Sequence, residues 1–402
     1  MSRQSAALKI PEFVSMLALM VSIVALSIDA MLPAMAEIGA DLGLSNPNSV
    51  QLVVSIMFLG LAVGQVFAGP LSDSYGRKPV IYGGYLIFGF GCVLSMLAES
   101  FAIMLAGRFL QGLGASAPRI VSVALVRDGY EGSAMARIMS IVAAIFIFVP
   151  TIAPAIGQAV LLLMNWRAIF ALLLVTALFG FMWFAVRQPE TLPPQARRPF
   201  SLPDIMAGAL EVMQHRAVMG YTMVMGVTLG AFIGYLSSAQ QVFQGVFGTG
   251  QWFVVYFGAA SLAIGSASVF NARLVVGRGM SYMTTGALVA VSAASLCYLP
   301  LVVLFSGVPP LWTFMVWLLL SMFCHGVVGG NLNAMAMESI GHLAGLGAAV
   351  VGTVSALIAL PVGWSIGAVF DGTVAPLVLG FAATGLLSVF LIRWTEHQPA
   401  PA

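Results

Sequence analysis

Apolar residues form long continuous runs along the whole chain, and polar residues gather in the gaps between them. A run of about 20 apolar residues is long enough to cross the hydrocarbon core of a bilayer as a helix. The approximate runs are 12–35, 50–70, 79–98, 102–126, 138–163, 167–186, 217–239, 251–272, 281–304, 310–334, 344–370 and 374–393. They do not alternate between apolar and polar positions, as the strands of a membrane barrel do. The pattern therefore predicts an all-α polytopic membrane protein with twelve transmembrane helices.

One long polar gap, residues 187–216, is rich in proline and lies close to the middle of the chain. It divides the apolar runs into six and six. We therefore predict an N-terminal six-helix bundle over 1–186, a cytoplasmic linker over 187–216 and a C-terminal six-helix bundle over 217–402.

The composition excludes several classes of protein. Hydrophobic residues make up 60% of the 402 residues and charged residues only 7%, with a mean hydropathy of +1.02. An ordinary soluble domain has about 45–50% apolar and about 25% charged residues. So few charges cannot cover a water-facing surface, which excludes a soluble enzyme, a nucleic-acid-binding protein and a disordered chain. The three cysteines all fall inside apolar runs, so we expect no disulfide framework, no metal site and no cofactor.

The distribution of positive charge predicts the orientation, because cytoplasmic loops of membrane proteins are enriched in Lys and Arg. With a cytoplasmic N-terminus, most of the 16 Lys and Arg residues fall on the cytoplasmic side. This set is Arg3, Lys9, Arg77, Lys78, Arg127, Arg137, Arg187, Arg197, Arg198, Arg216, Arg273, Arg278 and Arg393. Only Arg167 falls outside, while Arg108 and Arg119 lie within a span. Both termini are therefore expected to be cytoplasmic.

The loop after the second run reads GPLSDSYGRKP and has a distinctive arrangement of glycine and charge at Gly69, Asp73, Gly76, Arg77 and Lys78. Glycines allow a tight turn and close helix approach, and an aspartate can cap a helix or pair with a nearby arginine. This loop resembles the cytoplasmic loop motif of the major facilitator superfamily. The resemblance implies two pseudo-symmetric six-helix bundles and a charged loop that controls conformational switching.

A fainter repeat supports two similar halves. The loop after the eighth run reads NARLVVGRG, and Gly277-Arg278 matches Gly76-Arg77 at an offset of about half the chain length. Internal repeats of this kind are common in secondary transporters.

Further motifs resemble the drug:proton antiporter branch of the same superfamily, and the Bcr/CflA drug-resistance group within it. Arg108-Phe-Leu-Gln111-Gly-Leu-Gly114 is similar to the antiporters' helix 4 motif, and Asp29-Ala-Met-Leu-Pro33 resembles the Bcr/CflA first helix. The fifth run is similar to the antiporters' helix 5 motif at Pro150, Pro154 and Gly157. It departs from that motif at Ala153 and Gln158, where the pattern prefers glycine.

Few ionisable residues lie inside the spans, and each costs about 2.5–3.5 kcal/mol on insertion scales. They are Asp29, Arg108, Arg119 and, in the second half, His325. From helical rise, Asp29 lies about 25 Å and Arg108 about 21 Å above the inner surface. We therefore predict that they form a functional pair for proton coupling, although a purely structural role for Arg108 is the alternative.

The helical period places Arg108 and Arg119 on one face, with Gln111 beside it. We expect the substrate cavity to include Asp29, Arg108, Gln111, Arg119 and His325. Snorkelling of Arg119 toward the inner surface and a simple packing role for His325 remain open alternatives.

These observations predict a proton-coupled exporter of small amphipathic compounds that works by alternating access. Its expected partners are a small-molecule substrate, protons and membrane lipids, with no nucleic acid. We expect a monomer in the bacterial inner membrane that is not an enzyme. An exporter of a sugar or other metabolite is the alternative, and a membrane-embedded enzyme or a channel is the alternative from a different class.

Overall fold

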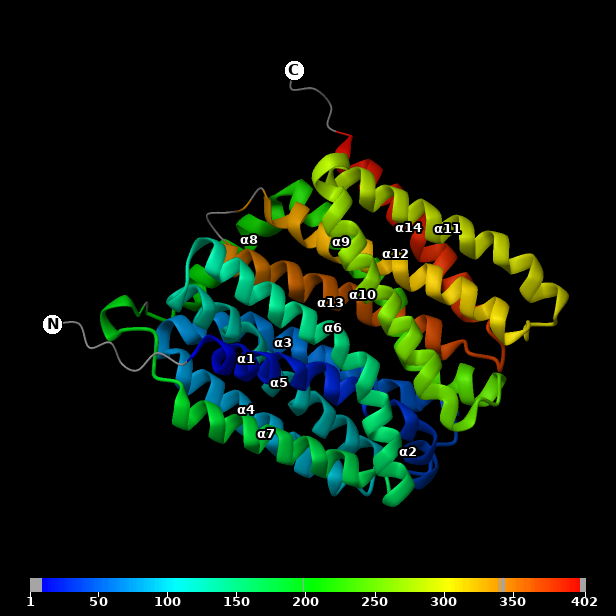
Figure 1. Ribbon diagram of the computed structural model, residues 1–402, viewed down its shortest axis with the longest axis horizontal. Helices are drawn as coiled ribbons and strands as arrows, with labels where there is room; N and C mark the ends of the chain where they lie inside the picture. Colours follow the sequence, from blue (N-terminus) through cyan, green and yellow to red (C-terminus); the bar gives the residue numbers. More distant parts are fainter. Residues whose placement is uncertain (1–8, 198, 339, 341–343, 398–402) are drawn as a thin grey trace. The chain divides into compact units, whose positions relative to one another are not determined.

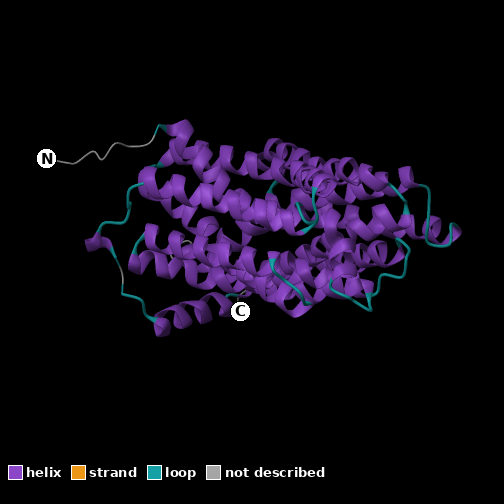
Figure 2. Cartoon of the chain, turned by 90° about the horizontal axis from the view of Figure 1, so that it is seen from below, coloured by secondary structure: helices purple, strands orange, loops and turns teal. Residues whose placement is uncertain are grey.

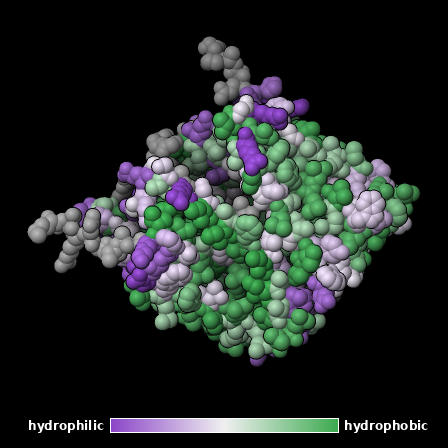
Figure 3. Space-filling view, in the orientation of Figure 1, coloured by the Kyte–Doolittle hydropathy of each residue, from purple (hydrophilic) through white to green (hydrophobic). Residues whose placement is uncertain are grey.

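The computed structural model describes residues 9–197, 199–338, 340 and 344–397 (Figure 1). Arg3 and Arg198, which were used to predict orientation, lie outside these residues. Within the described chain, twelve helical segments are long and apolar enough to cross a membrane, and only helices and loops occur in this part (Figure 2). This confirms the predicted all-α fold. Hydrophobic side chains cover much of the face in Figure 3, as a lipid-facing surface requires.

The chain divides into two compact units, each with its own internal packing. Unit 1 comprises residues 1–31 and 56–202, and unit 2 comprises residues 32–55 and 203–402. Segment 32–55 therefore packs with the C-terminal helices, which differs from the predicted division at 186 and 217. That division into two six-helix bundles stays a prediction.

Unit 1 is built from helices joined by short loops. They are α1 (Ile10–Asp29), most of α3 (Leu52–Tyr75), α4 (Arg77–Met96), α5 (Phe101–Gly129), α6 (Gly132–Leu163) and α7 (Arg167–Arg187), with the short η3 (Pro194–Ala196). Helix α1 packs mainly on α6 and α5, and α4 packs on α5 and α7. The run predicted over 12–35 is interrupted, because α1 ends at Asp29 and a 3-10 turn, η1 (Leu32–Ala34), contains Pro33.

Unit 2 begins with η1, α2 (Met35–Asp41) and η2 (Pro47–Gln51) from the N-terminal part of the chain. Its other elements are α8 (Leu202–Gln214), α9 (Arg216–Gln240), the π-helical turn η4 (Gln241–Val246), η5 (Gly250–Trp252), α10 (Phe253–Arg278), α11 (Met280–Leu304), α12 (Leu311–Glu338), α13 (Ala344–Ala368) and α14 (Ala375–Glu396). Helix α8 lies inside the predicted linker, where the sequence analysis predicted no helix.

Small residues bring the backbone of α5 close to its neighbours. A Cβ added at Gly60 of α3 would overlap the carbonyl oxygen of Phe109, and one at Gly114 would overlap the Phe88 amide of α4. Only glycine leaves room for backbones this close. These contacts fix α5 between α3 and α4 and so set the position of the charged residues that α5 carries.

The two interhelical loops matched by sequence share one backbone feature. Gly76, between α3 and α4, has φ 105° and ψ 160°, and Gly279, between α10 and α11, has φ 84° and ψ 150°. A positive φ of this size favours glycine. The structural equivalent of Gly76 is therefore Gly279, so the alignment of Gly76 with Gly277 is wrong by two positions.

Candidate functional site

The loop between α3 and α4 centres on the Arg77 side chain, of which only 8% is exposed. Its guanidinium forms ion pairs with Asp73, one turn earlier, and with Asp128 at the end of α5, where Nε lies 2.9 Å from Oδ2. It also donates to Ser72 Oγ at 2.9 Å. Arginine suits this position because its planar fork of donors can hold two carboxylates at once. The cluster ties the end of α3 to the end of α5.

Helix α4 begins at Arg77, and the Glu190 carboxylate caps its first turn. The carboxylate accepts hydrogen bonds from the backbone N–H groups of Arg77 and Lys78, both at 3.0 Å. An anion is stabilised there by the exposed amides and the helix dipole. A Cβ at Gly76 would lie 2.6 Å from the Glu190 carboxylate, which gives this glycine a second reason to lack a side chain.

Lys78 completes the connection between this loop and the end of α7. Its Nζ donates to the backbone carbonyl oxygens of Ala185 at 3.1 Å and Gln188 at 2.6 Å. The last carbonyls of a helix lack partners within the helix, so a cation is favourable there. Gly69, the first residue of the motif, lies within α3, and a Cβ there would meet no other atom within 4 Å.

Asp29 is the last residue of α1 and is only 4% exposed. Within the described chain, its carboxyl group forms no side-chain hydrogen bond and no ion pair. The next residue, Ala30, lies against α6, because a Cβ added at Gly157 would overlap the Ala30 carbonyl oxygen. Pro150, Pro154 and Gly157 all lie within the continuous helix α6. The α6 segment that resembles the antiporters' helix 5 motif thus packs beside the chain segment that carries Asp29.

Arg108 is completely buried in α5, but the structure does not pair it with Asp29. Its guanidinium donates to Gln111 Oε1 at 2.5 Å and to Met57 Sδ at 2.8 Å, and it lies 5.9 Å from the centre of the Phe170 ring. Gln111 in turn donates to the Gly91 carbonyl oxygen of α4 at 3.1 Å. The two side chains form no ion pair in this structure, because similar depth on two helices does not decide which way the side chains point. The predicted functional pair for proton coupling stays a prediction.

Arg119 lies two turns of α5 beyond Gln111 and is partly exposed. Its guanidinium forms no hydrogen bond or ion pair with a described residue. Arg119 and Arg108 share a helix face, as predicted, yet the first is partly exposed and the second is enclosed.

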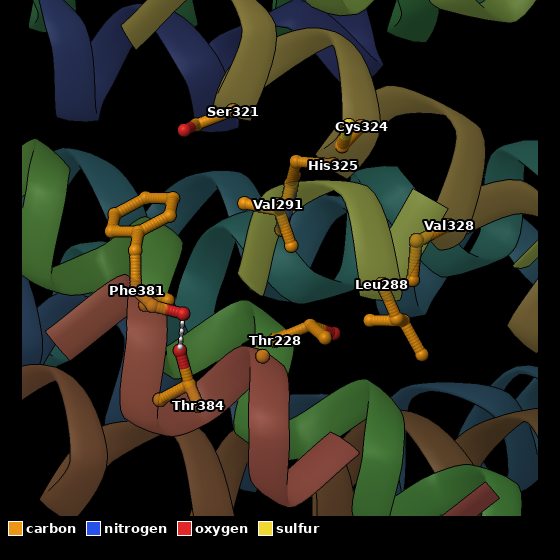
Figure 4. A pocket seen from close by; sticks show the side chains of 11 residues that line it. Thr228, Leu288, Val291, Ser321, Cys324, His325, Val328, Phe381 and Thr384 are labelled. Carbon is orange, nitrogen blue, oxygen red and sulfur yellow. Dashed lines mark hydrogen bonds between the residues drawn. The ribbon is translucent and has the colours of Figure 1, made fainter. Parts of the chain in front are cut away.

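His325 of α12 lies in unit 2, whereas the other predicted cavity residues lie in unit 1. It stacks on Phe232 with 4.9 Å between ring centres. It also lines a cavity of about 20 Å³, which has room for about one water molecule. Figure 4 shows the residues of α9, α11, α12 and α14 around this space, among them Thr228 and Thr384. The cavity is too small for a drug-sized molecule, so His325 has no substrate-sized space around it in this structure.

A cluster of uncharged amides in unit 2 was missed by the sequence analysis. Gln51 donates to Gln241 Oε1 at 2.6 Å and to the Gly367 carbonyl oxygen at 3.1 Å. Asn48 accepts from Gln241 at 3.1 Å and donates to the Phe370 carbonyl oxygen at 2.9 Å. These bonds join segment 32–55 to the start of η4 and to the end of α13. Isolated Asn and Gln residues give no pattern by which such a cluster could be found.

The fold and its buried charges define a polytopic membrane transporter. The sequence profile of the Major Facilitator Superfamily matches residues 17–363. The chain belongs to this superfamily, as the loop motif predicted.

Two of the relatives below match most of the chain, and the third matches about a third of it. It is 31% identical to a protein of Bacillus subtilis described as an uncharacterized MFS-type transporter, YdgK, over 83% of each chain. It is 27% identical to the bicyclomycin resistance protein homolog of Haemophilus influenzae over 90% of each chain. It is 36% identical to the multidrug resistance protein MdtL of Escherichia coli over 36% of each chain. The protein is therefore a superfamily transporter with drug-resistance relatives.

Solved structures agree on the fold. The xylose transporter XylE of Escherichia coli matches with a TM-score of 0.76 at 13% identity, covering 97% of this chain and 98% of XylE. The human organic anion transporter MFSD10 matches with a TM-score of 0.68 at 18% identity, covering 96% of this chain and all of MFSD10. At this level of identity the likeness concerns the fold alone.

Proposed function

We propose that this transporter exports small amphipathic compounds in exchange for protons. The observation that carries the proposal is Asp29, a buried carboxyl group at the end of α1 with no hydrogen-bonding partner in the described chain. An ionisable residue inside a membrane span is costly and typically marks an ion or substrate pathway. Such a carboxyl group can take up a proton in one conformation and release it in another.

Two further observations support export of amphipathic compounds. The relatives named for bicyclomycin resistance and multidrug resistance share sequence with this chain. The α6 motif packs beside Asp29 through Gly157, so a movement of α6 would change the surroundings of the carboxyl group. Proton binding at Asp29 and helix movement are thereby coupled.

We assign to the charged loop between α3 and α4 the control of switching between conformations. Arg77 and Lys78 hold the ends of three helices together through Asp128, Ala185 and Gln188. The ion pairs and hydrogen bonds of this cluster involve α3, α4, α5 and the end of α7, whereas Asp29 lies on α1. We therefore expect the cluster to act on the rate of the conformational change. Arg108 and Gln111 position α5 against α4, and a direct role for Arg108 in proton coupling stays a prediction.

The proposed setting is the bacterial inner membrane, with both termini in the cytoplasm and the protein acting as a monomer among lipids. The support is the excess of Lys and Arg on one side of the predicted spans. We propose no enzymatic step and no cofactor. A sugar or other metabolite is the alternative substrate, for which the described residues offer no specific observation.

The test is transport driven by a proton gradient in proteoliposomes of known orientation. An amphipathic fluorescent dye is expected to accumulate in the lumen only when the lumen is acidic. Protons are expected to leave the lumen as the dye enters. Accumulation that is unaffected by collapsing the pH gradient with nigericin would contradict proton exchange. Accumulation of labelled sugars in place of dyes would favour the metabolite exporter.

A further inference from the structure

The two arginines inside α5 differ in what their side chains bind. Arg108 is fully buried and donates to Gln111 and Met57. Arg119 forms no hydrogen bond or ion pair with any residue that the structure describes. A guanidinium stays charged under all ordinary conditions and carries five donors. Of these two arginines, Arg119 is therefore the one whose donors remain available to a ligand.

Arg119 stands on a face of α5 that is mostly buried. At 100° per residue, Gly112, Ala115, Ser122 and Val126 all lie within about 60° of Arg119 around the helix. All four are buried. The exposed surface at Arg119 continues at Val123, which is 37% exposed and lies one turn nearer the end of α5.

No acid of unit 1 within the described chain neutralises this charge. Glu12 pairs with Arg187, and both Asp73 and Asp128 pair with Arg77. Glu190 caps α4. The other described acids of unit 1 form no ion pair with Arg119; they are Asp29, Glu99 and Glu131.

Asp29, which lies within a candidate membrane span, is also at a different depth from Arg119. Arg119 lies ten residues before the end of α5 at Gly129, or about 15 Å along the helix. Asp29 is the last of the 20 residues of α1, about 30 Å from its start. Arg119 and Asp29 therefore differ in depth by about 15 Å, or about half the thickness of the hydrocarbon core. An anion beside Arg119 would not be strongly repelled by Asp29, even when Asp29 is ionised.

We propose that Arg119 binds the negatively charged headgroup of the exported compound, so that the substrates are amphipathic organic anions such as carboxylates and sulfonates. The inference rests on the proposed export function and adds the substrate class. The planar guanidinium holds two oxygens of such a headgroup with parallel hydrogen bonds. The greasy part of the substrate lies against the surrounding apolar helices, and Asp29 binds the proton separately.

The test uses two dyes that differ only in charge. 8-Anilinonaphthalene-1-sulfonate and N-phenyl-1-naphthylamine share the same rings, but only the first carries a sulfonate. Each is titrated against the full-length protein in nanodiscs, with protein-free nanodiscs as the background. Arg119→Gln is expected to weaken binding of the sulfonate at least about tenfold, the loss of one charge-assisted interaction. Binding of the uncharged dye is expected to stay unchanged, which also shows that the variant is folded.

Two further variants sharpen the result. Arg119→Lys keeps the charge without the fork of donors, so an intermediate loss of sulfonate affinity is expected. Arg127→Gln removes an exposed arginine from the last turn of the same helix and is expected to change neither affinity.

The outcomes separate this inference from the function on which it rests. Unchanged sulfonate affinity in Arg119→Gln, or equal weakening of both dyes, would overturn the anion site while leaving amphipathic export intact. Failure of the unmodified protein to bind either dye would count against amphipathic export itself, and the anion site would fall with it.

Discussion

The two compact units use different chemistry inside the membrane. In unit 1, Asp29 lies within the candidate membrane span Ile10–Asp41, and Arg108 and Arg119 lie within the span Phe101–Gly129. In unit 2, the described charges lie toward helix ends, and the interior polar contacts are uncharged. Examples are the Gln51–Gln241 bond and the reciprocal pair between Asn271 and Asn331. We therefore propose that proton and ion chemistry belongs to unit 1, whereas these contacts in unit 2 are hydrogen bonds that do not depend on charge.

The equivalent loops of the two units share a backbone conformation but differ in charge. Gly76 and Gly279 each precede a helix with a positive φ. Next to Gly76, Arg77 is buried between two carboxylates and Glu190 caps the helix. Next to Gly279, Arg278 is exposed and Val276 stands at the position that corresponds to Asp73. Both loops share the turn, but among the described residues the charged cluster surrounds Gly76 and has no counterpart at Gly279.

The largest effect is expected at Asp29. Asp29→Asn removes the proposed proton carrier, so transport driven by a pH gradient should fall to background in proteoliposomes. Counterflow of substrate, which needs no net proton movement, should persist. Glu338→Gln, at an exposed helix end of unit 2, is the control and should transport normally. Full gradient-driven transport by Asp29→Asn would end the assignment of proton coupling to unit 1.

The charged loop is expected to contribute to stability where its counterpart does not. Arg77→Ala leaves two carboxylates without their cation and should lower the free energy of unfolding by about 2 kcal/mol. Arg278→Ala removes an exposed charge and should change it by less than about 0.5 kcal/mol. Reversible unfolding in mixed micelles measures the change in the free energy of unfolding for both variants. Equal losses in the two variants would mean that the loops are energetically alike.

Close packing at α6 should matter more than an open position in unit 2. Gly157→Ala places a methyl group against the Ala30 carbonyl oxygen and should cost about 1–2 kcal/mol while slowing transport. Gly286→Ala in α11 meets no other atom within 4 Å and should be neutral or stabilising by up to about 1 kcal/mol. Thermal unfolding and initial transport rates measure both. A harmless Gly157→Ala would show that α6 does not need to approach α1 so closely.

The smallest effect is expected at the amide pair of unit 2. Asn271 and Asn331 exchange hydrogen bonds of 2.7 and 3.0 Å between α10 and α12. Hydrogen bonds between membrane helices average about 0.6 kcal/mol in double-mutant cycles. A cycle with Asn271→Ala and Asn331→Ala should give a coupling energy of that order, unchanged between acidic and neutral pH. A coupling that varies with pH would show that charge also operates in unit 2.

Much of the fold followed from the sequence because hydropathy and loop motifs are local signals. The twelve spans and the superfamily were predicted from continuous apolar runs and from residues 69–79. The helix ends were less accurate, since Pro33 ends α1 at Asp29 within an unbroken apolar run.

The site was predicted less completely, because its contacts join distant parts of the chain. Glu190 caps a helix that begins 113 residues earlier, and no spacing rule connects them. The depth of Arg108 was estimated well enough to suggest Asp29 as its partner, yet the guanidinium turns to Gln111 on its own helix. Side-chain direction depends on how helices are rotated against one another, which hydropathy does not record.

Proton release on substrate binding tests the central claim most directly. The purified protein in weakly buffered detergent solution receives a saturating amphipathic dye, and a pH indicator reports the protons released per protein. We predict a release by the unmodified protein and by Arg77→Ala, and none by Asp29→Asn at equal dye occupancy. An undiminished release from Asp29→Asn would contradict the account, because the exchanged proton would then come from another group.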